Sequence, residues 1–260
     1  MIRSVFLSHG APLLALDPGL YADRFRELGR LLDSAQSLIV ISPHWMTRYL
    51  TVGTAASYPA IHDFGGFPSA LYQLRHDIAG APEQSEQLAA RLTGQGIPVR
   101  LEHHEGVDHG VWMPHRMMAL PAAQPIVPIS MPASLDATGA YRLGGALAQA
   151  MPDAVVWGTG GMTHNLQEFR GQARDAAVDP RVREFAEWMR EHIEALDHPA
   201  LLDYRRRAPH ALANHPTDEH LLPLFVALGA AGTDHKPSLA ADGYTHGILS
   251  MMAFTFAGAR

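Results

Sequence analysis

Short apolar runs rich in β-branched residues recur along the chain, and they limit its fold more than any other feature. Runs of this kind, with no polar residue at alternate positions, are typical of strands buried on both faces of a parallel sheet. We predict strands over residues 2–7, 38–42, 99–101, 126–130 and 154–157.

The segments between these runs carry apolar residues at helical spacing. We predict helices over residues 21–32 and 182–196, and a third that begins at Pro82 and ends at Gly94 or Gly96. Their apolar faces are Phe25, Leu28, Leu31 and Leu32 in the first and Val182, Phe185, Met189, Ile193 and Leu196 in the second. Strands alternating with helices predict an α/β fold, with a central, mostly parallel sheet flanked by helices. At 260 residues the chain is expected to form a single domain, residues 1–260.

The composition excludes several classes of protein. Charged residues make up 18% and hydrophobic residues 47% of the chain, as in a globular protein, and no apolar run reaches the roughly 18 residues that suggest a membrane span. The first ten residues do not resemble a signal peptide, so we expect a cytoplasmic protein. A formal net charge of −6 argues against nucleic acid and favours a small-molecule partner. The chain has no cysteine, so any metal must bind nitrogen and oxygen ligands.

Three histidines follow predicted strands directly. His9 lies in residues 8–12 after the first strand, His44 in residues 43–45 after the second, and His164 in residues 158–165 after the last. Ligands of α/β sheets bind beyond the carboxyl ends of the strands, where these loops converge. We therefore expect the active site at this edge of the sheet. Glycines beside His9 and His164 would leave room for a ligand near the backbone.

A fourth histidine is predicted to come from a helix. Thr217 could cap a helix whose first turn carries Glu219 and His220, and the positive end of that helix would keep His220 neutral. His215 lies five residues before His220 and should not share its helix face, so His220 is the better ligand. His9, His44 and His220 would then form a three-nitrogen metal site with open positions.

Other residues near these loops could shape a substrate site. His109 and His62 both lie in loops with adjacent carboxylates, where they could orient a substrate or bond to their neighbours. Six aromatic residues could wall a flat aromatic substrate, although each by itself is equally typical of a core: Trp45, Tyr58, Phe64, Phe67, Trp112 and Trp157.

Taken together, these motifs resemble a known enzyme family nearly from end to end. They are SHGAP at 8–12, SPHW at 42–45, IHDFGGFP at 61–68, DHG at 108–110, GTGGMTHNL at 158–166 and NHPTDEHLLPL at 214–224. The sequence resembles the DOPA 4,5-dioxygenase type of class III extradiol ring-cleavage enzymes, whose wider family includes the protocatechuate 4,5-dioxygenase β-subunit.

The resemblance implies the chemistry of the site. His9, His44 and His220 would be metal ligands, His164 would be a fourth ligand or an acid–base residue, and His109 would face oxygen or substrate. Fe(II) would be the metal that supports turnover, and Zn(II) could occupy the same site in purified protein. The substrates would be a DOPA-like catechol and O2, and the product a muconic semialdehyde.

Several alternatives remain open from sequence. Many class III enzymes use two histidines and a glutamate, and Glu219 stands beside His220. The histidines would also suit a zinc-dependent hydrolase of an amide or ester, or a non-catalytic protein that binds a catechol or a metal. The natural catechol, the ring bond that is cleaved and the oligomeric state are not specified by these motifs.

Overall fold

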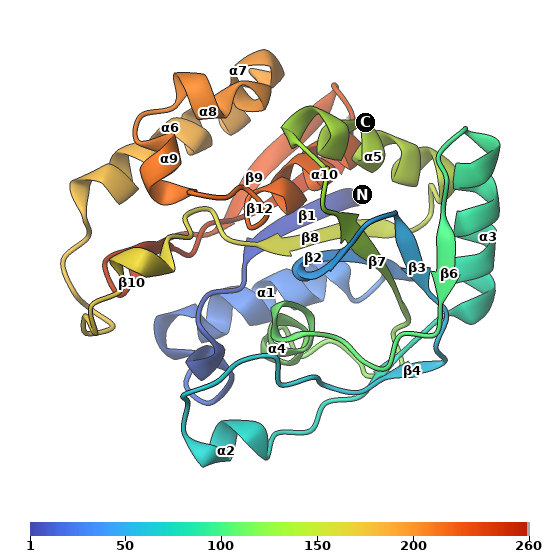
Figure 1. The fold of residues 1–260 in the computed structure, drawn as a ribbon, viewed down its shortest axis with the longest axis horizontal. Helices are drawn as coiled ribbons and strands as arrows, with labels where there is room; N and C mark the ends of the chain where they lie inside the picture. The colour runs from blue at the N-terminus through green and yellow to red at the C-terminus, as the bar shows by residue number, and fades with distance from the viewer. Residues whose placement is uncertain (259–260) are drawn as a thin grey trace.

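The computed structural model describes residues 1–258 and is built around an eight-stranded sheet (Figure 1). Its strands are β1 (Ile2–Ser8), β2 (Leu38–Thr47), β3 (Thr51–Gly53), β6 (Arg100–Glu102), β7 (Ile126–Pro132), β8 (Val155–Gly160), β9 (His235–Ala241) and β12 (Ala253–Gly258). They lie in the order β6-β3-β7-β2-β8-β1-β12-β9. Two further two-stranded pairs join β4 (Ser57–Tyr58) to β5 (Ile78–Ala79) and β10 (Tyr244–Thr245) to β11 (Leu249–Ser250).

The four central strands β7, β2, β8 and β1 run parallel, which confirms the predicted sheet. Strand β6, predicted as a member of this parallel set over 99–101, pairs parallel with β3, but β3 runs antiparallel to β7. Only residues 48–50 separate β2 from β3, too few for the crossover that a parallel connection needs. The chain therefore reverses direction at this edge. At the other edge, β12 runs antiparallel to both β1 and β9.

Six helices of eight or more residues cover the sheet. They are α1 (Ala22–Leu32), α3 (Pro82–Gly94), α4 (His109–Met117), α5 (Ala137–Ala150), α6 (Pro180–Glu194) and α10 (Leu222–Ala231). The shorter helices are α2 (Ser69–Tyr72), α7 (His198–Leu202), α8 (Tyr204–Arg207), α9 (Ala211–Asn214) and the 3-10 turns η1 (Pro12–Ala15), η2 (Gly19–Tyr21) and η3 (Leu166–Glu168). Figure 1 shows α1 and α4 on one side of the sheet and α5 and α10 on the other.

The central strands bury side chains on both faces. In β2, Leu38 and Val40 pack into the core beneath α1 and α4, whereas Ile39 and Ile41 pack into the core beneath α5 and α10. This arrangement explains why the strand has no polar residue at alternate positions. Leu31 was predicted on the buried face of α1, but its side chain is exposed, because that face passes through Phe25, Leu28 and Leu32. Leu196 was predicted on the apolar face of the second helix, but it lies beyond the end of α6.

The predicted helix start at Thr217 was wrong. Helix α10 begins at Leu222, with Pro223 in its first turn, where proline is favoured because it has no amide hydrogen to leave unpaired. Before it, the amides of Leu221 and Leu222 both donate to the Asp218 carbonyl and form a turn. His220 therefore lies in a turn that precedes the helix. All ten residues of α10 are buried.

Within residues 1–258, the structure contains no helix of the length and apolar character needed to cross a bilayer.

Candidate metal centre

The structure brings together the five histidines to which the family resemblance assigned a role. The ring centroids of His9 and His44 are 5.2 Å apart, those of His44 and His220 are 5.0 Å apart, and those of His9 and His220 are 5.7 Å apart. The His109 ring lies 4.2 Å from that of His44. The His164 ring stacks on His220 with centroids 3.4 Å apart and an interplanar angle of 5°.

Five different elements deliver these side chains to the carboxyl edge of the parallel strands, and His164 comes from the loop that follows β8. His9 directly follows β1, His109 is the first residue of α4, and His220 precedes α10. His44 lies inside β2, which extends beyond the predicted end of this strand. Pro43 has no amide hydrogen to donate, and the pairing of β2 with β7 is interrupted between Ile41 and Met46. His44 therefore lies in an irregular stretch of the strand.

Thr159 fixes the proton position of His9. The Thr159 hydroxyl donates to the carbonyl of Gly110, so its oxygen can only accept from the His9 Nδ1–H, 3.2 Å away. The lone pair of His9 is then on Nε2, which lies 3.4 Å from Nε2 of His44. Two ring nitrogens at this distance can face a shared cation.

Glu219 does the same for His220. Its carboxylate oxygen Oε1 accepts from the Nδ1–H of His220 at 3.0 Å, which leaves the lone pair of His220 on Nε2. Nε2 is buried and has no hydrogen-bond partner within the described part of the chain. Buried polar atoms are nearly always paired, so an unpaired nitrogen beside two other imidazoles fits a metal ligand.

Asp63 contacts two of the histidines. Its Oδ1 atom accepts hydrogen bonds from the backbone amide and Nδ1 of His109, at 2.9 and 3.0 Å. Its Oδ2 atom lies 3.7 Å from Nδ1 of His44. Burial alone would raise the pKa of Asp63, but the hydrogen bonds from His109 outweigh it and lower that pKa below its usual range.

Burial keeps the imidazoles of His9, His44, His164 and His220 neutral. Together with a smaller contribution from the neighbouring histidines, it lowers the pKa of His44 to about 3 and that of His164 to about 2. Burial also lowers the pKa values of His9 and His220. The hydrogen bond from His220 lowers the pKa of Glu219 to about 2. Neutral imidazoles beside ionised carboxylates are the protonation states that bind a divalent cation.

The chemistry of the donor set fits a metal ion. His9, His44 and His109 form one group whose candidate ligand atoms lie within 4.8 Å of one another, and His164, Glu219 and His220 form another. His9, His109 and His220 are buried, whereas the His44 side chain is 22% exposed. Solvent therefore reaches the cluster on the side of His44.

The glycines at the carboxyl end of β8 have a structural role. A Cβ atom at Gly160 would overlap the carbonyl oxygen of His220, and one at Gly158 would overlap that of Pro223. The amide of Gly161 donates to the His220 carbonyl at 2.8 Å. These glycines bring the His220 turn against β8, which is a different role from the ligand access that the sequence suggested.

Asp108 and Ser42 support the site, and the motifs DHG and SPHW contain them, but no role was predicted for either residue. The Ser42 hydroxyl donates to Oδ1 of Asp108 at 2.7 Å, and the amide of Gly110 donates to the same atom at 2.9 Å. Asp108 therefore caps α4 and ties it to β2. Burial, assisted by the charge of Asp63, raises the pKa of Asp108 to about 6. Thr159 was also missed, because it reaches His9 from another strand.

Other residues considered in the sequence lie outside the cluster. His215 is buried and its Nε2–H donates to the carbonyl of Met162 at 2.9 Å, so it supports the loop that leads to His164. His62 packs against Phe64 and Trp112. Of the six predicted wall residues, Tyr58, Trp112 and Trp157 are fully buried in the core, whereas Phe64 contacts His109.

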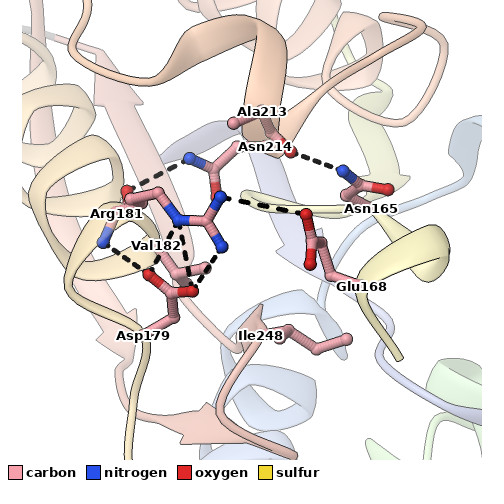
Figure 2. A pocket seen from close by; sticks show the side chains of 8 residues that line it. All are labelled: Asn165, Glu168, Asp179, Arg181, Val182, Ala213, Asn214 and Ile248. Atoms are coloured by element: carbon pink, nitrogen blue, oxygen red, sulfur yellow. Dashed lines mark hydrogen bonds and ion pairs between the residues drawn. The ribbon is translucent and has the colours of Figure 1, made fainter. Parts of the chain in front are cut away.

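A pocket beside the His164 loop contains none of the five histidines (Figure 2). Across it, the side-chain amide of Asn165 donates to the carbonyl of Ala213 at 2.7 Å, and that of Asn214 donates to the carbonyl of Arg181 at 3.1 Å. The Arg181 guanidinium pairs with Asp179 at 2.7 Å. The amide of His164 donates to the Asn214 carbonyl at 3.1 Å. This network holds the His164 loop against α9.

Comparison with known proteins agrees with the geometry. Residues 5–257 match the family described as the catalytic LigB subunit of aromatic ring-opening dioxygenase. The chain belongs to this family. It is 32% identical to a 4,5-DOPA dioxygenase extradiol of Beta vulgaris over 98% of this chain and 96% of that protein. A protein of the same name from Escherichia coli K12 is also 32% identical, over 96% of this chain and 93% of its own length.

The fold agrees as well. A crystal structure of an uncharacterized protein from Escherichia coli K12 superposes with a TM-score of 0.80 and 27% identity, covering 99% of this chain and all of that one. The predicted α/β fold and the predicted family are thus confirmed, and the LigB-family chain is an extradiol dioxygenase.

Proposed function

We propose that this dioxygenase opens the ring of a DOPA-like catechol with O2 at an Fe(II) ion held by His9, His44 and His220, and releases a muconic semialdehyde. The names of the relatives support the choice of a DOPA-like catechol. Zn(II) could occupy the same nitrogen ligands in purified protein, because such sites discriminate poorly between these two ions.

The observation that carries the proposal is the unpaired nitrogen of His220. Nε2 is buried without a partner, while Nδ1 is held by Glu219. His9 has the same arrangement, with Nδ1 held by Thr159 and the lone pair on Nε2 facing His44. A hydrogen-bond acceptor on one ring nitrogen and a free lone pair on the other is the usual pattern of metal-binding histidines.

The stacking of His164 on His220 supports an acid–base role for His164 over a ligand role. A nitrogen lone pair lies in the plane of its imidazole ring, and these two rings are nearly parallel at 3.4 Å. The lone pairs of the two rings therefore lie in separate, parallel planes, so His220 would hold the ion while His164 would stay free to exchange a proton.

The residues around the ion divide the remaining work. Fe(II), when bound, supplies adjacent coordination positions for a catechol and O2 and the redox chemistry that O2 requires. His164 accepts a proton from a catechol hydroxyl, which makes the substrate a better ligand. His109, whose ring lies 4.2 Å from that of His44, faces the substrate or O2. The exposed side of His44 gives the substrate access.

Reconstitution tests the proposal. Metal-free protein is loaded anaerobically with Fe(II) or Zn(II), a panel of catechols that includes DOPA is added with air, and oxygen uptake is recorded with the yellow absorbance of the semialdehyde. We expect uptake with Fe(II) only, and loss of uptake in His44→Ala. His192→Ala on α6 is the matched control and should keep full activity.

Two results would contradict the proposal. The first is an absence of oxygen uptake across the whole catechol panel with Fe(II). The second is cleavage of an ester or amide that depends on Zn(II), which would favour a hydrolase. The NMR spectrum of the product identifies the ring bond that is opened.

A further inference from the structure

The residues that precede Asp63 attach its loop to the start of α4. The amide of Ile61 donates to the carbonyl of Val107 at 2.8 Å, and the amide of Val107 donates to the carbonyl of Pro59 at 3.0 Å. The indole Nε1–H of Trp112 donates to the carbonyl of Ile61 at 2.9 Å. These bonds fix the backbone next to Asp63 to the helix that begins with His109.

Aromatic packing holds the other side of the loop. The ring of Phe64 meets the rings of Phe67 and Tyr72, each with centroids 5.4 Å apart, and it meets the His109 ring edge-on at 5.6 Å. Such contacts restrict ring orientation as well as position. Asp63 therefore lies in a loop with little freedom to move its carboxylate.

The carboxylate of Asp63 is shared between two histidines with different roles. Oδ1 accepts from the backbone amide and from Nδ1 of His109, and Oδ2 lies 3.1 Å from Nδ1 of His109 and 3.7 Å from Nδ1 of His44. Asp108, the other carboxylate grouped with Asp63 near His44, uses its Oδ1 atom for Ser42 and Gly110.

We propose that Asp63 is a positioning residue that fixes the His109 tautomer with its proton on Nδ1 and orients the metal-facing ring of His44. An ionised carboxylate only accepts hydrogen bonds, so His109 must present its proton at Nδ1 and its lone pair at Nε2. The same charge lies beside Nδ1 of His44, whereas Nε2 on the other side of that ring faces His9. Asp63 therefore restrains the His44 ring from the side away from His9. The catalytic consequence rests on the proposed function, whereas the tautomer does not.

Asp63→Asn tests the tautomer without depending on turnover. The amide keeps one oxygen acceptor but places an N–H donor near the Nδ1 atoms of both histidines. In metal-free protein labelled with ¹⁵N-histidine, we expect the His109 signals, assigned by their loss in His109→Gln, to change from the Nδ1–H pattern toward the Nε2–H pattern. Unchanged signals in Asp63→Asn would overturn the proposal.

The matched control is Glu184→Gln. Glu184 and His210 form a carboxylate–histidine pair at 2.8 Å on the surface, outside the site. This variant should leave the His109 signals unchanged. If Asp63→Asn does not fold, Asp63→Ser keeps a hydroxyl acceptor for the His109 amide but cannot hold Nδ1, and the same shift is expected. A change of the His109 signals in Glu184→Gln would count against the assignment to Asp63.

Metal binding and turnover then test the two proposed effects of Asp63, on the His44 ring and on the His109 tautomer. Zinc affinity, measured by competition with a chromophoric chelator, should fall about tenfold in Asp63→Asn, and kcat should fall by about 10- to 100-fold with a smaller change in KM. Asp63→Asn should cost little in a His109→Gln background, because Asp63 acts partly through His109. Equal losses in both backgrounds would show that Asp63 does not act through His109. If wild-type enzyme shows no turnover, the proposed function fails, while the NMR and zinc results still decide the role of Asp63.

Discussion

Glu219 has the most direct effect on His220, since its charged oxygen holds Nδ1 at 3.0 Å. Replacing Glu219 with Gln removes the charge and keeps the size. Carboxylates behind metal-binding histidines raise the basicity of the ligand, so we expect zinc affinity to fall by about 10- to 100-fold. Competition with a chelator measures this change. Glu102→Gln is the control, because Glu102 faces His104 at 3.8 Å, outside the histidine cluster; an equal loss there would contradict the prediction.

At this scale the sequence predicted which histidines meet but not what holds them. His9, His44 and His164 follow from the rule that loops converge at the carboxyl ends of parallel strands. Thr159 could not be recognised as the partner of His9, because that hydrogen bond joins neighbouring strands whose order in the sheet is not written in either segment. Asp63 was noted only as a neighbour of His62, whereas it contacts His109 and His44.

Two adjacent glycines of α5 test how closely this helix packs on α10. A Cβ atom at Gly144 would overlap the carbonyl oxygen of Val226, whereas one at Gly145 would meet its nearest atom, the carbonyl oxygen of Gly229, at 3.7 Å. Gly144→Ala should therefore lower the free energy of unfolding by about 1–3 kcal/mol through overpacking. Gly145→Ala should raise it by about 0.5–1 kcal/mol, because alanine favours a helix interior. Urea unfolding of both variants checks the pair, and a stabilised Gly144→Ala would refute the close packing.

Helices and strands were predicted correctly where the sequence signal was local. The predictions failed where contacts between distant segments determine the structure. The four buried parallel strands and helix α3 were found from apolar runs and from Pro82 and Gly94. The start of α10 was misplaced, because Thr217 is a typical cap but the backbone turns around Asp218 first. Strands β9 and β12 were not predicted, since they complete the sheet by pairing with β1 and with each other, which depends on contacts between distant segments.

At the scale of the whole molecule, metal binding should stabilise the fold. The three proposed ligands come from distant parts of the chain, at positions 9, 44 and 220, and the unfolded chain cannot hold them together. A ligand that binds only the folded state at 100 times its Kd adds about 2.7 kcal/mol. Thermal unfolding with and without Zn(II) should show a higher Tm with the metal. His220→Ala should lose this shift and His192→Ala should keep it; a shift that survives in His220→Ala would count against the proposed ligand set.

The buried histidines should also make the metal-free protein sensitive to acid. Burial lowers the pKa of His115 to about 3 and that of His215 to about 4, whereas an unfolded histidine titrates near 6.5. Below pH 6.5 the unfolded chain therefore binds more protons than the folded one, so stability is full above pH 6.5 and falls as the pH drops toward these lowered values.

The quantity to measure is the slope of the free energy of unfolding against pH. Each histidine that stays neutral in the fold contributes about 1.4 kcal/mol per pH unit well below pH 6.5, and His44 and His164 add to the effect because burial lowers their pKa values to about 3 and about 2. Urea unfolding of metal-free protein between pH 7.5 and 5 should show a steep fall in the free energy of unfolding. His115→Gln removes one such histidine, so its free energy of unfolding should fall less steeply with pH, by the contribution of one proton. This difference in slope is expected even though the absolute stability of the variant also changes. An identical slope in His115→Gln and wild type would mean that His115 becomes protonated inside the fold, which its full burial beside His76 makes costly.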